Sequence, residues 1–269
     1  MRGIMIGFAS IPYTIRAAVI LFATEVLLCD TGISAGNERV KSFRAAKKLL
    51  PGIFSGQETT FYCGCRYSGK DVSHEKCGYA PRKARTSKGK VNRRAHRLEW
   101  EHVVPAHAFG QSFEEWRTPA NFRKCLSSNR KPISGRRCAK KLSIEFRMME
   151  SDLFNLRPAI GEVNGLRSNY SMAMLEGEVR DFGKCDVEIR NRKIEPRTDI
   201  RGDIARTYQY MNCVYPGRGI ISSKNRKTFD AWSVEDPVSE QEIRWARKVS
   251  AVQGNCNPFV QKDCPLRCG

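Results

Sequence analysis

A carboxylate and an imidazole stand side by side at Glu101-His102, within the segment LEWEHVVPA at positions 98–106. A carboxylate oxygen can bind a hard divalent cation, and a neutral imidazole can accept a proton from water. The run from Arg82 to Arg97, just before this pair, contains eight Lys or Arg among sixteen residues. Such a run attracts a polyanion. Together these residue types supply what hydrolysis of a phosphodiester bond requires.

The segment that carries this pair has the composition of a short strand. Trp100 to Val104 is rich in aromatic and β-branched residues, and Pro105 ends it. Neighbouring residues on a regular strand point to opposite faces. Glu101 and His102 can therefore share a site only if the backbone bends there or the site lies at the edge of the strand.

The elements around this segment are predicted from apolar spacing. Residues 37–59 contain a helix in which Phe43, Ala46, Leu49 and Leu50 share a face, and the Pro51-Gly52 pair ends it. The residues at 59–62 have the composition of a strand. The basic run at 82–97 is too polar for a core and is expected to form a surface loop.

The second half of the chain is predicted to be mainly helical. Residues 111–141 read as a basic loop, and a helix then runs from Leu142 to about Asn155. Another helix contains residues 204–211. Ser239 and Glu242 form a capping box at the start of a third helix. The polar stretch at 162–167 is expected to be a tight turn stabilised by its glycines.

Length and charge limit the class of protein. The chain has 269 residues and a formal net charge of +19, with 47 Lys and Arg against 28 Asp and Glu. A hydrophobic content of 41% is typical of a folded globule, and this length suffices for one sizeable core. We find no internal repeat or linker. The simplest organisation is a single mixed α+β domain over residues 36–269, and its charge favours a nucleic-acid partner.

Residues 1–35 have the features of an export signal. Arg2 and Arg16 precede the apolar run at 17–28, and small residues follow at 31–36. An apolar run this short is typical of a signal peptide, because a membrane span needs about 20 residues. We therefore expect a periplasmic or secreted protein without a membrane partner.

The cysteines favour disulfide bonds. Eleven are present, and ten remain if Cys29 leaves with the signal. An even number behind an export signal is typical of a disulfide-stapled protein. The alternative is a zinc site at Cys63, Cys65 and Cys77. Structural zinc sites usually use ligand pairs separated by two to four residues, so the one-residue gap at Cys63-Gly64-Cys65 disfavours zinc.

Several motifs occur in a characteristic order along most of the chain. They are TFYCGC (60–65), CGY (77–79), EWEHVVPA (99–106), FG (109–110), SDLFNL (151–156), PAIGEVNGLR (158–167), RGDIARTY (201–208), FDAW (229–232) and VQGNCNPFV (252–260). In these motifs the chain resembles the endonuclease I family of bacterial periplasmic and secreted nucleases. The resemblance covers nearly everything from about residue 40 to 264.

The resemblance implies a fold and a metal site. The family uses a ββα-metal site, in which a short hairpin and the helix that follows it hold one divalent cation. On this chain it implies Glu101 and Asn155 as metal ligands and His102 as the general base. One carboxylate and one amide oxygen suit Mg²⁺, or another divalent cation such as Mn²⁺, because Mg²⁺ keeps several waters in its coordination shell.

The resemblance also implies an arginine that contacts the scissile phosphate. Arg136 and Arg137 both precede Cys138, and Arg136 is favoured because it follows Gly135, as the arginine of the family follows a glycine. Further expected contacts with the substrate come from the basic and polar residues near the site. They are Arg137, Arg94, Arg97, Asn164 and Arg167.

These features predict a monomeric, metal-dependent endonuclease of low sequence specificity that hydrolyses DNA and RNA. Contacts with backbone phosphates carry no sequence information, which favours low specificity. The resemblance implies products with 5′-phosphate ends. Two alternatives stay open. One is a non-catalytic, disulfide-rich nucleic-acid-binding protein, and the other is a zinc-dependent hydrolase that uses the cysteine cluster.

Overall fold

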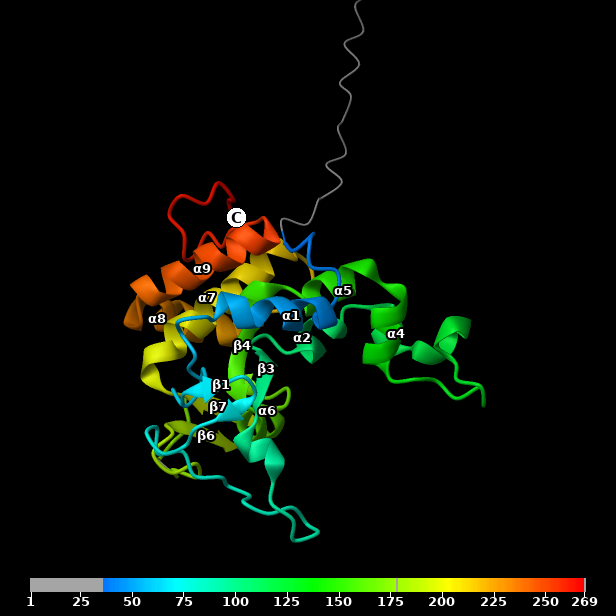
Figure 1. Ribbon diagram of the computed structural model, residues 1–269. Coiled ribbons are helices and arrows are strands. Elements are labelled where there is room, and N and C mark those ends of the chain that lie inside the picture. Colours follow the sequence, from blue (N-terminus) through cyan, green and yellow to red (C-terminus); the bar gives the residue numbers. More distant parts are fainter. Residues whose placement is uncertain (1–35, 178, 269) are drawn as a thin grey trace, which may run out of the picture. The chain divides into compact units, whose positions relative to one another are not determined.

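The computed structural model describes residues 36–177 and 179–268, which belong to one compact unit (Figure 1). The export segment predicted over residues 1–35 lies outside the described residues. Among the described residues, none of the helices is long and apolar enough to span a membrane.

Helices supply most of the regular structure. The α-helices are α1 (Phe43–Ile53), α2 (Ala106–Gly110), α3 (Glu114–Arg117), α4 (Gly135–Leu142), α5 (Ile144–Glu150), α6 (Gly161–Arg167), α7 (Arg201–Val214), α8 (Ser223–Glu235) and α9 (Glu240–Gln253). Short 3₁₀ helices are η1 (Arg93–His96), η2 (Pro119–Asn121), η3 (Arg123–Cys125), η4 (Leu153–Asn155) and η5 (Thr198–Ile200). The longest helices, α7 and α9, each have 14 residues.

The strands form three small sheets. They are β1 (Tyr67–Ser68), β2 (Asp71–Val72), β3 (Leu98–His102), β4 (Leu156–Ile160), β5 (Ser171–Met172), β6 (Val187–Arg190) and β7 (Lys193–Pro196). β1 pairs with β2, β3 pairs with β4, and β7 lies between β5 and β6. This mixture of helices and strands confirms the predicted α+β class.

The antiparallel pair β3–β4 lies at the centre of the molecule and leads directly into α6. Leu98 is opposite Ile160, and His102 is opposite Leu156. Every residue of β4 is buried, including Arg157, whose guanidinium lies over the ring of Trp245. α6 begins at Gly161, immediately after the last residue of β4. The pairing of β3 with β4 therefore fixes the position of α6 relative to the end of β3 that carries Glu101-His102.

Helices pack around the strand pair (Figure 1). α1 packs on α9, while α7 and α9 both pack on η4. The buried Asp152 connects them, because its carboxylate accepts hydrogen bonds from Tyr210, Tyr215 and Gln253. Burial raises the pKa of Asp152, and these three donors act in the opposite direction. The network fixes the chain just before β4.

Five disulfide bonds use all ten cysteines of the described residues. The pairs are Cys63–Cys185, Cys65–Cys77, Cys125–Cys138, Cys213–Cys268 and Cys256–Cys264. The predicted disulfide-stapled character is confirmed. No cysteine of the cluster is a free thiolate that could bind zinc, so the cysteine-based zinc site is not formed.

Several predicted elements are confirmed, although their ends differ. The first helix continues through Pro51 to Ile53, because a proline in a last turn removes only one donor. The strand around Trp100 and the helix at 204–211 are present as β3 and α7. Ser239 caps α9 by accepting a hydrogen bond from the amide of Glu242, as the capping box predicts.

Other expectations were wrong. Residues 59–62 form an isolated bridge at Thr59 followed by a turn, not a strand. The helix expected from Leu142 to Asn155 is divided into α4, α5 and η4, because Ser143 and Asp152 each cap a new start. The basic segment 111–141, expected to be a loop, contains α3, η2, η3 and all but the last residue of α4. The polar stretch 162–167 is the helix α6, not a turn.

Candidate active site

A pocket of about 460 Å³ opens at the end of β3. Its lining includes Glu101 and His102 from β3, Arg136 from α4, and Asn164 and Arg167 from α6. We call it the catalytic pocket. Arg94 from η1 also lines it, so the structure brings together six of the residues that the sequence analysis selected, from four elements.

His102 is the last residue of β3 and is held from the side of α1 and α5. Its ring lies 4.7 Å from that of Phe43, and its Nε2 is 2.8 Å from the carbonyl oxygen of Glu150. A carbonyl oxygen only accepts hydrogen bonds, so Nε2 carries the proton. The other nitrogen, Nδ1, is left without a proton and can act as a base.

Burial lowers the pKa of His102 to about 4, and the nearby charge of Arg136 acts in the same direction. The side chain is therefore neutral at pH 7, which is the state that a general base needs.

Glu101 is held from the other side of the strand. Its Oε1 accepts hydrogen bonds from the hydroxyl of Tyr62 at 3.0 Å and from Nη1 of Arg167 at 2.8 Å. Burial raises the pKa of Glu101, while Arg167 and Tyr62 act in the opposite direction. Glu101 and His102 thus keep their alternate orientations and meet at the strand end. No bend of the strand is required.

Arg167, for which the sequence analysis predicts a contact with substrate, is buried beside β3. Its side chain is only 1% exposed, and it ion-pairs with Glu101. Its Nη1 also donates to the carbonyl of His102, and its Nη2 donates to the carbonyl of Val103. These contacts fix the backbone that carries Glu101-His102. Arg167 is a buried positioning residue.

The two asparagines also differ from the prediction. Asn155 does not line the catalytic pocket and is fully buried. Its Oδ1 accepts a hydrogen bond from the amide of Val104 at 2.7 Å, and its Nδ2 donates to the carbonyl of Val104 at 3.0 Å. The amide oxygen expected to bind a metal is thus engaged in joining the segment after β3 to η4.

Asn164 lines the catalytic pocket instead. Its Nδ2 donates to Oε2 of Glu99 at 3.0 Å, which orients the amide. Gly161 lets the start of α6 approach η1 closely, because a Cβ there would lie 2.7 Å from the carbonyl oxygen of Arg94. The Oδ1 of Asn164 is the remaining polar atom of this side chain.

Glu99 organises the arginines that precede β3. Arg94 donates to it through Nε at 2.9 Å and Nη2 at 2.7 Å, and Arg97 donates through Nη2 at 2.6 Å. The side chains of Arg94 and Arg97 nonetheless remain 46% and 54% exposed. Both can therefore meet a phosphate at the surface while Glu99 holds their positions.

Of the two arginines before Cys138, Arg136 lines the catalytic pocket. Its Nε donates to Oε1 of Glu150 at 2.8 Å, and its side chain is 45% exposed. A Cβ at Gly135 would lie 2.0 Å from the carbonyl oxygen of Trp116, so this glycine lets α4 approach α3 closely. Arg137 is exposed on α4 and lines none of the pockets described here.

The sequence analysis did not identify Tyr62, Glu99 and Glu150 as parts of the site. Glu150 links the two catalytic candidates, since its carbonyl binds His102 and its carboxylate binds Arg136. The motif context at 60–65 and 99–106 was the available signal for Tyr62 and Glu99. Nothing in the sequence near Glu150 indicated its role.

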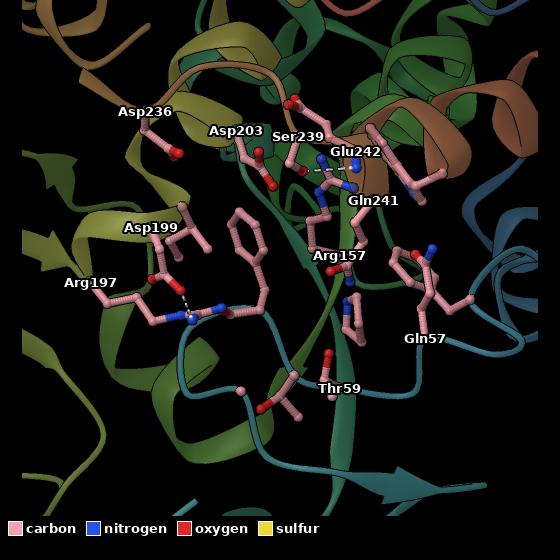
Figure 2. Close-up of a pocket in the computed structure, with 17 residues that line it drawn as sticks. Gln57, Thr59, Arg157, Arg197, Asp199, Asp203, Asp236, Ser239, Gln241 and Glu242 are labelled. Atoms are coloured by element: carbon pink, nitrogen blue, oxygen red, sulfur yellow. Dashed lines mark hydrogen bonds and ion pairs between the residues drawn. The ribbon is translucent and has the colours of Figure 1, made fainter. Parts of the chain in front are cut away.

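A separate pocket of about 320 Å³ shares no lining residue with the catalytic pocket (Figure 2). It carries the carboxylates Asp199, Asp203, Asp236 and Glu242. The guanidinium of Arg157 lies over the ring of Trp245, 3.2 Å from its centroid, and the charges of Asp203 and Glu242 act on it. Four carboxylates disfavour a phosphate group, so the catalytic pocket is the better candidate for phosphodiester chemistry.

The low pKa of His102 predicts the pH dependence of any reaction in which this side chain is the base. The ring takes up a proton only near pH 4, whereas an exposed histidine does so near 6.5. The acidic limb of kcat/KM is therefore expected closer to pH 4 than to 6.5. Folding stability should decrease as the pH falls between these values, because the unfolded chain binds the proton first. An acidic limb at 6.5 in the pH–rate profile would contradict this assignment.

Comparisons with known proteins identify the family. The endonuclease I family model matches residues 52–264. The "Periplasmic deoxyribonuclease" of Aeromonas hydrophila is 37% identical over 94% of this chain and 98% of its own length. An "Extracellular deoxyribonuclease" of the same organism is 38% identical over 84% of this chain and 91% of its own length. "Endonuclease-1" of Buchnera aphidicola subsp. Acyrthosiphon pisum (strain APS) is 36% identical over 84% of this chain and 82% of its own length. The chain belongs to the endonuclease I family.

Proposed function

We propose that this protein is a divalent-metal-dependent endonuclease that hydrolyses phosphodiester bonds of DNA and RNA with little sequence preference. The observation that carries the proposal is the position of His102. Its Nε2 is held by a backbone carbonyl, and it shares a pocket with Glu101, Arg136 and Asn164. Relatives named deoxyribonuclease and endonuclease support the same reaction class.

The donor set of the catalytic pocket fits Mg²⁺ or Mn²⁺. We assign the two protein ligands to Glu101 and Asn164, in place of Asn155, because Oδ1 of Asn155 is engaged by Val104. One carboxylate and one amide give oxygen ligands only, which hard cations prefer. When bound, the ion would stabilise negative charge that develops on the phosphate oxygens. With the β3–β4 pair and α6 as its frame, this is a ββα-metal arrangement.

Side chains of the protein supply the base, the phosphate contact and the positioning of Glu101. Nδ1 of His102 accepts the proton of the attacking water, and the Glu150 carbonyl keeps the ring in the required tautomer. Arg136, held by the Glu150 carboxylate, binds the scissile phosphate. Attack on phosphorus forms a new P–O bond and breaks the bond to O3′, which takes a proton from solvent water and leaves as a 3′-hydroxyl, so the other product carries the 5′-phosphate. Arg167 and Tyr62 keep Glu101 in place.

The proposed location is the periplasm or the medium. All ten described cysteines form disulfides, which persist in oxidising compartments. Two of the relatives have names that place them in the periplasm or outside the cell. We propose that residues 1–35 direct export and that the mature protein acts as a monomer on the phosphate backbone.

The proposal is tested with supercoiled plasmid and with a structured RNA, each incubated with the purified protein and Mg²⁺ or Mn²⁺. We expect nicked and then linear plasmid and shortened RNA, and an excess of chelator should abolish both reactions. A DNA ligase should reseal the nicked plasmid without prior treatment by a kinase, because the products carry 5′-phosphates. A band shift without nicking would identify a nucleic-acid-binding protein instead, and full activity in excess chelator would exclude the metal.

A further inference from the structure

An open groove of about 770 Å³ adjoins the catalytic pocket. It shares Arg94, His102, Arg136 and Asn164 with that pocket, so the two spaces are continuous. Its other walls come from α1, from the turn between β1 and β2, and from the segment that includes η1 and β3. We call this space the α1 groove. The proposed chemistry needs only the catalytic pocket, so the groove requires a separate explanation.

One face of α1 forms a wall of the groove. Phe43, Lys47 and Pro51 lie four residues apart along it, and Arg44 and Lys48 lie beside them. The opposite face of α1 is buried in the core through Ala46, Leu50 and Ile53. The helix is therefore fixed by its apolar face and presents its basic face to the groove.

One face of β3 forms the floor. Leu98, Trp100 and His102 alternate along the strand, so their side chains share a face, and all three line the groove. Trp100 is partly buried, with its ring 5.7 Å from that of Phe54. An apolar and aromatic floor thus leads directly to the proposed general base.

The charges of the groove lie on both sides of this floor. Arg44, Lys47 and Lys48 belong to α1, and Lys70, Arg94, Arg97 and Arg136 belong to the facing segments. Glu99 is the one acidic residue among the residues that line the groove, and it is paired with Arg94 and Arg97. Two rows of positive charge therefore flank an apolar strip.

We infer that the α1 groove binds an unpaired nucleic-acid strand next to the scissile phosphate, with its phosphates between the two rows of cations and its bases on Trp100 and Phe43. This inference rests on the proposed function. A duplex keeps its base faces stacked inside the helix, so an apolar floor could not contact them. An unpaired strand exposes those faces, and stacking on an aromatic side chain is tolerant of sequence.

The test measures binding in a protein that cannot cleave. In the His102→Ala background and without metal, fluorescence anisotropy gives the affinity for a labelled oligothymidine strand and for a hairpin duplex. Trp100→Leu keeps an apolar side chain but removes the ring, and it should weaken strand binding about tenfold. Duplex affinity should change much less. If Trp100→Leu does not fold, Phe43→Leu removes the other ring to which the inference assigns the bases, the one on the α1 wall.

Lys47→Ala/Lys48→Ala should weaken strand binding and reduce the slope of log K against log salt by about one to two. The matched control is Lys224→Ala/Lys227→Ala, which removes two exposed charges from α8 and should change neither quantity. Unchanged strand affinity in both ring variants, or an equal loss for strand and duplex, would overturn the inference. The readout is binding, so it does not depend on whether the wild type cleaves.

Discussion

Replacing His102 with alanine should reduce the rate of phosphodiester cleavage by about 10²–10⁴-fold while the protein remains folded. The loss follows from the removal of Nδ1, the proton acceptor that the Glu150 carbonyl orients through Nε2. The remaining activity would come from Arg136 and the bound cation, which do not depend on the imidazole. Initial rates of plasmid nicking at saturating Mg²⁺ measure the effect, and circular dichroism checks the fold.

The matched control is His107→Ala. His107 also lines the catalytic pocket, but it is exposed, and its Nε2 contacts only the side chain of Gln111 at 3.3 Å. We expect His107→Ala to retain most of the wild-type rate. Equal losses in the two variants would show that any change in the pocket impairs cleavage, and robust cleavage by His102→Ala would exclude His102 as the base.

The sequence revealed the parts of this site that lie close together in the chain. Glu101 and His102 are adjacent, and Arg136 follows a glycine that the fold requires for close packing. Asn164 was identified as a contact with substrate, although its position suits a metal ligand. The role of Asn155 depends on a hydrogen bond to Val104, which is 51 residues away. No local pattern encodes such a contact.

The burial of Arg167 was equally hard to foresee. Arginine is mostly exposed in folded proteins, so an arginine beside a proposed phosphate site suggests a phosphate contact. Its burial depends on three partners at the end of β3 and just after it: the side chain of Glu101 and the carbonyls of His102 and Val103. Only the packing of α6 against β3 brings these groups together.

The fold shows the same division between local and distant signals. α7 and α9 were predicted because apolar periodicity and a capping serine are local features. β4 was missed, since it contains Pro158 and becomes a strand by pairing with β3, about sixty residues earlier. The division of the helix expected at 142–155 depends on Ser143 and Asp152, whose side chains compete for backbone amides.

If Asn164 rather than Asn155 is the second metal ligand, replacing the two asparagines should change different properties: the Mg²⁺ requirement for Asn164 and the stability of the fold for Asn155. Asn164→Ala should raise the Mg²⁺ concentration needed for half-maximal cleavage by at least about tenfold, the size expected even for loss of an outer-shell partner of a ligand. Stability should change little, because Asn164 is only partly buried and the substitution removes a side-chain hydrogen bond to Glu99 while leaving the backbone bonds of α6 intact.

Asn155→Ala should instead destabilise the fold by about 2–5 kcal/mol, because it leaves both the amide and the carbonyl of Val104 without their partner. Its Mg²⁺ dependence should match that of the wild type at a temperature where the variant is folded. Thermal melts and Mg²⁺ titrations of the cleavage rate separate the two effects. The reverse pattern, with Asn155→Ala alone shifting the Mg²⁺ requirement, would return the ligand role to Asn155 and would require Val104 to release its side chain when metal binds.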